Sequence, residues 1–381
     1  MKILHIASFC GNIGDNANHA GFRPWFQSLL GYSAKWENFE IRDIYRKERR
    51  FDKAFLTYAN KFNLIIWGGG NYFELWVDHS PTGTSLSIPE EIFKGIRSSM
   101  FFNALGVDDG QGHTTQTISR FRKFLKMLLS SPQYLVSVRN DGSMETLQNY
   151  CFDLPIHRVL KIPDGGFFAN YKSAACTFPG PHFGINIAGD MLSLRFPGGN
   201  QHTFQSFLSE LAEWIKKQVE QNSTITFTLF PHIFSDVTGC AQLLQTLPDS
   251  IRREKIRVAG YASGNQAAAR IFGEYATCDA VLGMRFHANV VPISLGVPTV
   301  GLCCYPQIYR VYNELGMSEN CINVTKFGFS DQLSAIVDQI CRTPSVARKK
   351  IAVIRKALSA QRKKQTAVIT DWLKGQKLKY R

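Results

Sequence analysis

Short apolar segments recur along the chain at the intervals expected for strands that alternate with helices. In the first half they cover residues 2–8, 39–44, 64–67 and 134–138, with a helical pattern at 120–131. A second series covers residues 182–188, 224–232, 255–262, 279–286 and 298–304, with helical patterns at 203–220 and 265–276. Such alternation builds parallel sheets with crossover helices. We therefore expect an α/β fold of two doubly wound, Rossmann-like domains that face each other across a cleft.

The turn-rich sequence Pro-Asp-Gly-Gly at 163–166 separates the two series. We predict an N-terminal Rossmann-like domain over 1–166, a C-terminal one over 167–345 and a basic amphipathic helical tail over 346–381. A chain of 381 residues is long enough for two domains with cores of their own. No apolar run reaches the roughly 20 residues that span a bilayer, and the chain opens directly into a strand pattern. We expect a cytoplasmic protein.

The formal charge of +14 is concentrated at the C-terminal end. Residues 348–381 hold twelve Lys and Arg against a single acid, Asp371, and their apolar residues recur every three or four positions. A basic amphipathic helix can lie peripherally on an anionic membrane at the inner face, or pack its apolar stripe on the body of the protein. Both alternatives stay open. No nucleic-acid-binding motif is present, so nucleic acid is not an expected partner. The sequence leaves the oligomeric state open.

The nine cysteines are scattered and include no Cys-x-x-Cys pair. This spacing indicates neither a disulfide framework nor a zinc site, and we expect no metal.

Two of the predicted strands run into glycine-bearing loops. Ligands of open α/β sheets bind beyond the carboxyl ends of the strands, where glycine lets a ligand approach the backbone and helix N-termini attract anions. For the triple glycine a tight turn is the alternative. The candidate binding residues in these loops are Gly11, Asn12, Gly14, Asp15 and Asn16 after the first strand, and Gly68, Gly69, Gly70 and Asn71 after the third.

Arg285 and His287 lie two residues apart at the start of a long apolar stretch. If residues 281–287 are extended, the two side chains share one face of a strand. A fixed cation beside a side chain that can donate a proton near neutral pH suits chemistry on an anionic substrate. Arg139 follows another strand and is a second candidate for anion binding, with an ordinary loop arginine as the alternative.

Together these motifs resemble the polysaccharide pyruvyl transferase family over residues 1 to about 318. The motifs are GNIGDNA at 11–17, GGGN at 68–71, SVRNDGS at 137–143, PDGGF at 163–167 and GMRFHANVVPISLGVPTVGL at 283–302. The resemblance implies a fold similar to that of GT-B glycosyltransferases. It also implies phosphoenolpyruvate as donor substrate, with no further cofactor, and a pyruvate ketal as product. The acceptor would be a sugar of a polysaccharide, such as an exopolysaccharide or capsule, or of a lipid-linked glycan precursor.

The chain departs from the family pattern after Tyr305. The family often carries a lysine two residues later, where this sequence has Gln307. Arg310 is a candidate to replace that cation.

In the implied reaction a proton reaches the methylene carbon of phosphoenolpyruvate before a sugar hydroxyl attacks. We expect His287 to be the general acid, with Arg285 and Arg139 holding the anionic donor. His232 is a candidate second acid or base, and Asp164 a candidate to accept a proton from the acceptor hydroxyl. A structural histidine and a simple turn are the alternatives for these two positions.

Two other functions remain open. A GT-B glycosyltransferase that uses a nucleotide sugar would need an acidic residue to hold the ribose, for which Glu274 is the candidate. A non-catalytic glycan-binding protein of the same fold would use aromatic residues such as those at 67–76 to stack on sugars.

Overall fold

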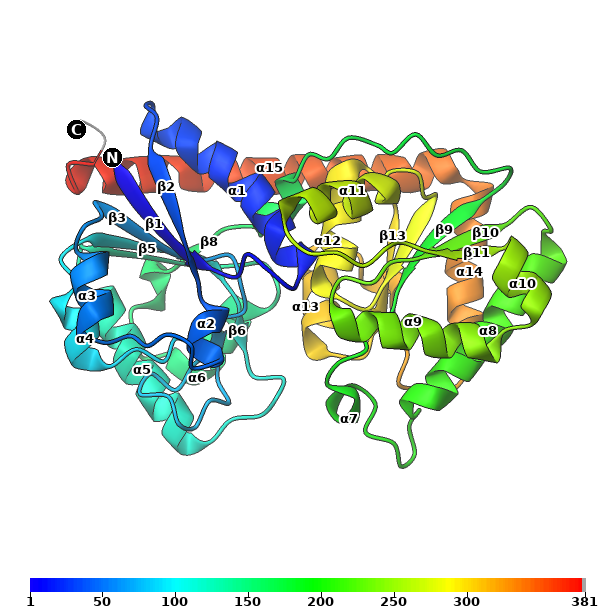
Figure 1. Ribbon diagram of the computed structural model, residues 1–381, viewed down its shortest axis with the longest axis horizontal. Helices are drawn as coiled ribbons and strands as arrows, with labels where there is room; N and C mark the ends of the chain where they lie inside the picture. The colour runs from blue at the N-terminus through cyan, green and yellow to red at the C-terminus, as the bar shows by residue number, and fades with distance from the viewer. Residues whose placement is uncertain (379–381) are drawn as a thin grey trace. The chain divides into compact units, whose positions relative to one another are not determined.

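Every strand pair in the two large sheets of the protein is parallel, and each sheet has helices on both faces (Figure 1). The computed structural model describes residues 1–378. Contacts within the chain group it into two units. Unit 1 comprises Met1–Phe9, Asn18–Gly165 and the chain from Leu358 onward; unit 2 comprises Cys10–Ala17 and Gly166–Ala357.

The sheet of unit 1 has the strand order β2-β1-β3-β5-β7-β8. Its strands are β1 (Lys2–Ala7), β2 (Lys35–Glu40), β3 (Leu64–Gly68), β5 (Ser99–Leu105), β7 (Tyr134–Val138) and β8 (Leu160–Lys161), and a small pair is formed by β4 (Phe73–Glu74) and β6 (Val107–Asp108). The helices are α1 (Ile13–Leu30), whose first residues up to Ala17 group with unit 2, α2 (Arg42–Tyr45), α3 (Lys53–Ala59), α4 (Glu90–Gly95), α5 (Thr115–Ser130) and α6 (Ser143–Cys151). A short 3-10 turn covers Ile156–Arg158, and a second, Gly165–Phe168, begins at the last residue of this segment of unit 1.

Two cores lie on opposite faces of this sheet because successive strand residues point to alternate sides. Leu4, Ile65 and Phe102 pack with α3, α4 and α5 on one face. Ile3, Ile66 and Phe101 pack with α1 on the other.

The sheet of unit 2 has the order β11-β10-β9-β12-β13-β14. Its strands are β9 (His182–Asn186), β10 (Thr226–Leu229), β11 (Ile256–Val258), β12 (Ala280–Gly283), β13 (Thr299–Cys303) and β14 (Cys321–Asn323). The helices are α7 (Leu192–Arg195), α8 (Phe204–Gln221), α9 (Phe234–Thr246), α10 (Asp249–Glu254), α11 (Asn265–Tyr275), α12 (Phe286–Leu295), α13 (Pro306–Glu314) and α14 (Phe329–Arg342), with a 3-10 turn at Ser318–Asn320. The predicted α/β class and the two Rossmann-like units are confirmed.

The expectation that residues 281–287 form one extended strand is wrong. Strand β12 ends at Gly283, and Arg285 is the N-cap of α12, so His287 lies in the first turn of a helix. The Asn289 amide donates to the carbonyl oxygens of Gly283 and Arg285, both at 2.9 Å, and these bonds stabilise the turn. Arg285 and His287 therefore do not share a face of a strand.

The C-terminal helix α15 (Pro344–Gly375) contains most of the basic tail. Its residues Ile369 and Leu373 are fully buried in unit 1 beside Phe22 and Phe26 of α1. The part of the apolar stripe at Ile369 and Leu373 thus packs on the body of unit 1, and contact of the basic face with a membrane stays a prediction. Within residues 1–378 no helix is long and apolar enough to cross a bilayer.

Candidate functional site

His287 and Gly14 lie in direct contact in unit 2, although 273 positions separate them along the chain. A Cβ atom built on Gly14 would lie 2.7 Å from Cγ and 2.8 Å from Cβ of His287. Real Cβ atoms do not approach so closely, so the absence of a side chain at residue 14 makes room for the imidazole. The Asn12 side chain accepts a hydrogen bond from the Gly14 amide at 2.9 Å and fixes the start of α1. The first glycine loop therefore holds a predicted catalytic residue in place.

The Arg285 guanidinium is held between two carboxylates. Its Nε donates to Asp236 Oδ2 at 2.7 Å, and its Nη2 donates to the other oxygen of Asp236 and to Asp190 Oδ1, the latter at 2.9 Å. Burial alone would lower the pKa of Arg285, but the two carboxylates outweigh it, and the pKa lies above its ordinary value. Arg285 is a permanent cation whose donors are mostly committed within the protein.

Asp236 and Asp190 differ in their exposure to solvent. Asp236 is fully buried, and its carboxylate also accepts hydrogen bonds from the backbone amides of Gly189 and His232, each at 3.0 Å. Burial would raise the pKa of Asp236, but Arg285 and these amides hold it below its ordinary value. The Asp190 side chain is 31% exposed. Asp236 is thus a fixed anchor for Arg285, whereas Asp190 faces solvent.

His232 is buried beside this pair. Its Nε2 lies 2.7 Å from the Tyr275 hydroxyl, and its Nδ1 has no hydrogen-bond partner among the described residues. Burial is the main cause that lowers the pKa of His232 to about 3. The charge of Asp236 opposes it, and the charge of Arg285 lowers the pKa further. The imidazole is therefore neutral at physiological pH.

Arg195 brings a second cation to the cluster. Its Nη2 lies 3.4 Å from Asp190 Oδ1, and its guanidinium stacks on the Tyr305 ring at 5.5 Å. A cation beside Tyr305 thus comes from α7. A role for Arg310 stays a prediction.

Arg139 is buried in unit 1. Its Nε donates to Asp141 Oδ2 at 2.6 Å and its Nη2 to Asn71 Oδ1 at 3.2 Å, while Asp164 lies 3.8 Å from Nη1. Burial would lower the pKa of Arg139, but the aspartates raise it above its ordinary value. The alternative of an exposed loop arginine is therefore wrong.

Asp164 is fully buried, and its Oδ2 accepts a 2.7 Å hydrogen bond from the Asn18 amide. The structure brings Arg139, Asp164 and Asn71 into one polar cluster of unit 1. Their part in binding an acceptor stays a prediction.

The triple glycine has a packing cause. Gly68 and Gly69 adopt positive φ values of 131° and 72°, which favour glycine. A side chain on Gly69 would overlap the Asn18 amide, and one on Gly70 would overlap the Tyr72 ring. Close approach of protein atoms thus accounts for these glycines, and contact with a ligand stays a prediction.

The residues predicted from the sequence fall into two groups. Unit 2 contains Arg285, His287 and His232 together with the loop residues Gly11, Asn12, Gly14, Asp15 and Asn16, while unit 1 contains Arg139, Asp164 and the residues Gly68, Gly69, Gly70 and Asn71. Asn16 donates to Asn265 Oδ1 at 2.9 Å, which joins the first glycine loop to the start of α11.

Three residues of the unit 2 cluster were not predicted from the sequence: Asp190, Asp236 and Arg195. Asp190 follows the end of β9 and Asp236 follows the end of β10. The position of each aspartate after the end of a strand was the one sequence feature that could have marked it as a candidate site residue.

A protein-family model described as polysaccharide pyruvyl transferase matches residues 12–302, which include the Gly14, Arg139, Arg285 and His287 motifs. The chain belongs to this family. The expected family membership is thereby confirmed, and the family is one of transferases of polysaccharide biosynthesis. No match was found among the curated proteins.

This family member has the GT-B-like fold that solved structures also show. Anabaena HepE, solved with UDP and glucose, is similar with a TM-score of 0.56 at 12% identity, over 97% of this chain and 100% of that one. A glycosyltransferase from Rickettsia africae is similar with a TM-score of 0.54 at 9% identity, over 98% of both chains. The UDP-GlcNAc 2-epimerase of Neisseria meningitidis, bound to UDP-GlcNAc, has a TM-score of 0.52 at 10% identity, over 94% of this chain and 99% of that one. At these identities the likeness concerns the fold alone.

Proposed function

We propose that this transferase moves the pyruvyl group of phosphoenolpyruvate onto two hydroxyls of a sugar to form a ketal. The observation that carries the proposal is the His287 imidazole, which is packed against Gly14 two residues after the anchored cation Arg285. A proton donor next to a fixed cation suits protonation of an anionic enol ester.

The chemistry assigns one role to His287. It protonates the methylene carbon of phosphoenolpyruvate, which makes the neighbouring carbon electrophilic, and a sugar hydroxyl attacks that carbon. The bond from this carbon to the phosphate oxygen breaks, and the second hydroxyl then closes the ring. One hydroxyl proton restores His287, and the other leaves with inorganic phosphate, so atoms and charges balance.

The charges of unit 2 suggest where the anionic donor binds. Arg285, Arg195, Asp236 and Asp190 carry no net formal charge as a group. Asp236 is buried and Asp190 is partly exposed, so a phosphate can compete with Asp190 for Arg285 but not with Asp236. We place the donor on the side of Asp190.

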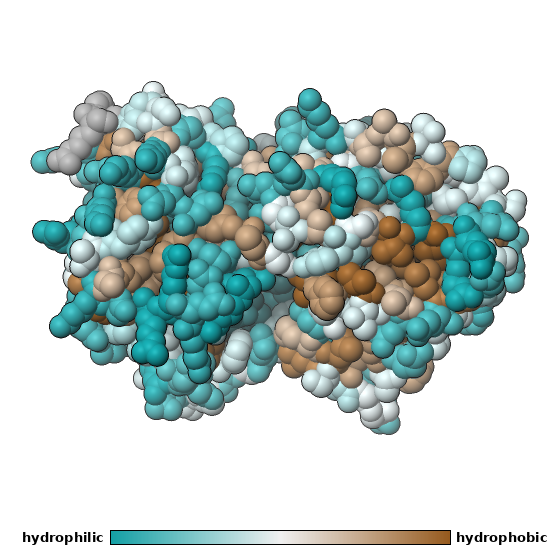
Figure 2. All heavy atoms as spheres, in the orientation of Figure 1, coloured by the Kyte–Doolittle hydropathy of each residue, from teal (hydrophilic) through white to brown (hydrophobic). Residues whose placement is uncertain are grey.

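An exposed aromatic pair supports a sugar as acceptor. Phe234, at the start of α9, is 71% exposed, and its ring centroid lies 5.9 Å from that of Tyr261. Figure 2 shows hydrophobic side chains gathered on the face that carries the start of α9 and β11. Exposed rings of this kind stack on the apolar faces of sugars. Phe234 is also two residues from Asp236, which anchors Arg285.

Transfer from a nucleotide sugar is the second candidate, because the solved structures of similar fold include UDP complexes. Its proposed ribose ligand, Glu274, instead accepts a 2.6 Å bond from Arg257. This engagement favours the pyruvyl transfer.

The test is release of inorganic phosphate from phosphoenolpyruvate by the purified protein, with galactose-, glucose- and N-acetylmannosamine-containing acceptors. We expect release that depends on an acceptor, and a product heavier than the acceptor by pyruvate less one water. Binding of UDP, with neither phosphate release nor a shift in Tm with phosphoenolpyruvate, would support the nucleotide-sugar reaction instead.

A further inference from the structure

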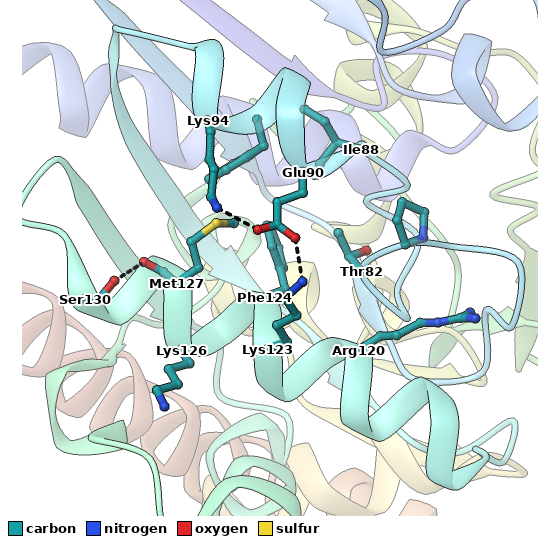
Figure 3. Close-up of a pocket in the computed structure, with 12 residues that line it drawn as sticks. Thr82, Ile88, Glu90, Lys94, Arg120, Lys123, Phe124, Lys126, Met127 and Ser130 are labelled. Atoms are coloured by element: carbon teal, nitrogen blue, oxygen red, sulfur yellow. Dashed lines mark hydrogen bonds and ion pairs between the residues drawn. The ribbon is translucent and has the colours of Figure 1, made fainter.

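A cavity of about 560 Å³ lies between α4, α5 and the loop before α4 in unit 1 (Figure 3). It shares no lining residue with the polar clusters described above. Its volume is in the range of small-molecule sites. The cavity is therefore a candidate binding site of its own.

The floor of the cavity is apolar and rigid. Phe93 of α4 and Phe124 of α5 are buried in the main core of the unit, with ring centroids 5.3 Å apart. Pro81, Ile88 and Met127 add to the apolar lining. Because Phe93 and Phe124 belong to the core, the floor keeps its shape when the cavity is empty or filled.

The rim of the cavity is basic. Four cationic side chains and one carboxylate line it: Lys94, Arg120, Lys123, Lys126 and Glu90. Glu90 lies between two of the lysines, 2.7 Å from Lys94 Nζ and 2.6 Å from Lys123 Nζ, as Figure 3 shows. One carboxylate does not neutralise two lysines, so this part of the rim keeps a positive charge.

Arg120 adds to that charge from the other side of the cavity. Its Nη1 donates to the main-chain carbonyl oxygens of Asp78 and Ser80, the latter at 3.3 Å. In Figure 3 its side chain extends below Thr82, away from Glu90. Bonds to neutral carbonyl groups orient the guanidinium without cancelling its charge.

We propose that this cavity binds an anionic lipid, with hydrocarbon against the apolar floor and phosphate on the basic rim. The apolar floor suits the hydrocarbon of such a lipid, and the basic rim suits its phosphate. Free phosphate would not use the apolar floor, and a neutral lipid would not use the cations. The inference does not rest on pyruvyl transfer, because it involves none of the residues assigned to that reaction.

The experiment measures binding of alkyl phosphates of increasing chain length to the full chain by calorimetry, below their micelle concentrations. We expect one site, with affinity rising by up to about fourfold for each methylene buried. Inorganic phosphate and a neutral alkyl glucoside of equal chain length should bind at least tenfold more weakly. A photoreactive alkyl phosphate should label peptides within residues 81–130.

Two variants separate the contributions of charge and hydrocarbon. Lys123→Glu should weaken alkyl phosphate binding at least tenfold, whereas Lys217→Glu, at an exposed position of α8 in unit 2, should leave it unchanged. Met127→Gln should flatten the dependence on chain length. Thermal melts followed by circular dichroism check that each variant is folded. Absence of binding by the wild type, equal binding of the neutral glucoside, or equal affinities in the two lysine variants would overturn the proposal.

Discussion

The His287 ring occupies the space that a side chain on Gly14 would need. The contact links two motifs that lie at opposite ends of the family match, residues 12–302. The first glycine loop therefore holds the His287 imidazole in place at the start of α12. Under the proposed function, the position of the proton donor therefore depends on a residue that has no side chain.

Replacing Gly14 by alanine should displace the His287 ring and lower kcat by at least tenfold. The added methyl group overpacks the site, at a cost of about 1–3 kcal/mol in stability. Gly375→Ala is the matched control, since a Cβ there meets no atom within 4 Å. Steady-state kinetics and urea unfolding of both variants make the comparison. Wild-type kcat in Gly14→Ala would show that the contact has no part in catalysis.

Removing the charge of either aspartate beside Arg285 should change a different property of the protein: substrate binding for Asp190 and stability for Asp236. Asp190→Asn removes the partly exposed competitor for Arg285, so we expect the KM for phosphoenolpyruvate to fall several-fold. Asp236→Asn breaks a buried ion pair, which should destabilise the protein by about 3–5 kcal/mol. Kinetics and urea unfolding at pH 7 test both expectations. A raised KM in a well-folded Asp190→Asn variant would contradict the placement of the donor.

His232 should make stability depend on pH in the acidic range. Its folded pKa of about 3 lies below the unfolded value of about 6.5, so the unfolded state binds more protons between these values. Stability is therefore lost as pH falls from about 6.5 towards 3, by roughly 2 kcal/mol at pH 5. His232→Gln should remove this part of the loss.

The measurement is the difference in unfolding free energy between pH 7 and pH 5 for wild type and variant. His5 and His182 also have pKa values lowered mainly by burial, but they contribute equally in both proteins. An identical loss in wild type and variant would show that His232 is not held neutral by burial.

Phe234 should contribute to acceptor binding and not to stability. Truncation of a stacking ring typically costs about 0.5–1.5 kcal/mol, so Phe234→Ala should raise the KM for the acceptor by about two- to tenfold. The KM for phosphoenolpyruvate should stay unchanged. Phe152→Ala, at a ring that is 77% exposed in unit 1, is the matched control. Equal acceptor KM values in both variants would remove Phe234 from the acceptor site.

Local sequence patterns predicted most of the strands, because a buried parallel strand is a short apolar run between turns. The predicted strand at 134–138 matches β7. Strand β5 (Ser99–Leu105) was not predicted, although it is central in its sheet. Its apolar run has no alternation to separate strand from buried helix.

The partners of Arg285 could not be predicted from the sequence. Asp236 and Asp190 lie 49 and 95 positions from Arg285, and only the order of the strands brings them together. The end of β12 at Gly283 also depends on a distant residue, since Asn186 accepts the Arg285 amide at 3.0 Å. The spacing of apolar residues along the sequence does not reveal such contacts.

The most direct test of the central claim is the reaction of phosphoenolpyruvate and an acceptor in heavy water, with wild type and His287→Gln. We expect one deuterium in the methyl group of the wild-type ketal. We expect no ketal from the variant, which should still bind phosphoenolpyruvate with nearly unchanged affinity. Ketal formation by His287→Gln at the wild-type rate would contradict the assignment of His287 as the proton donor.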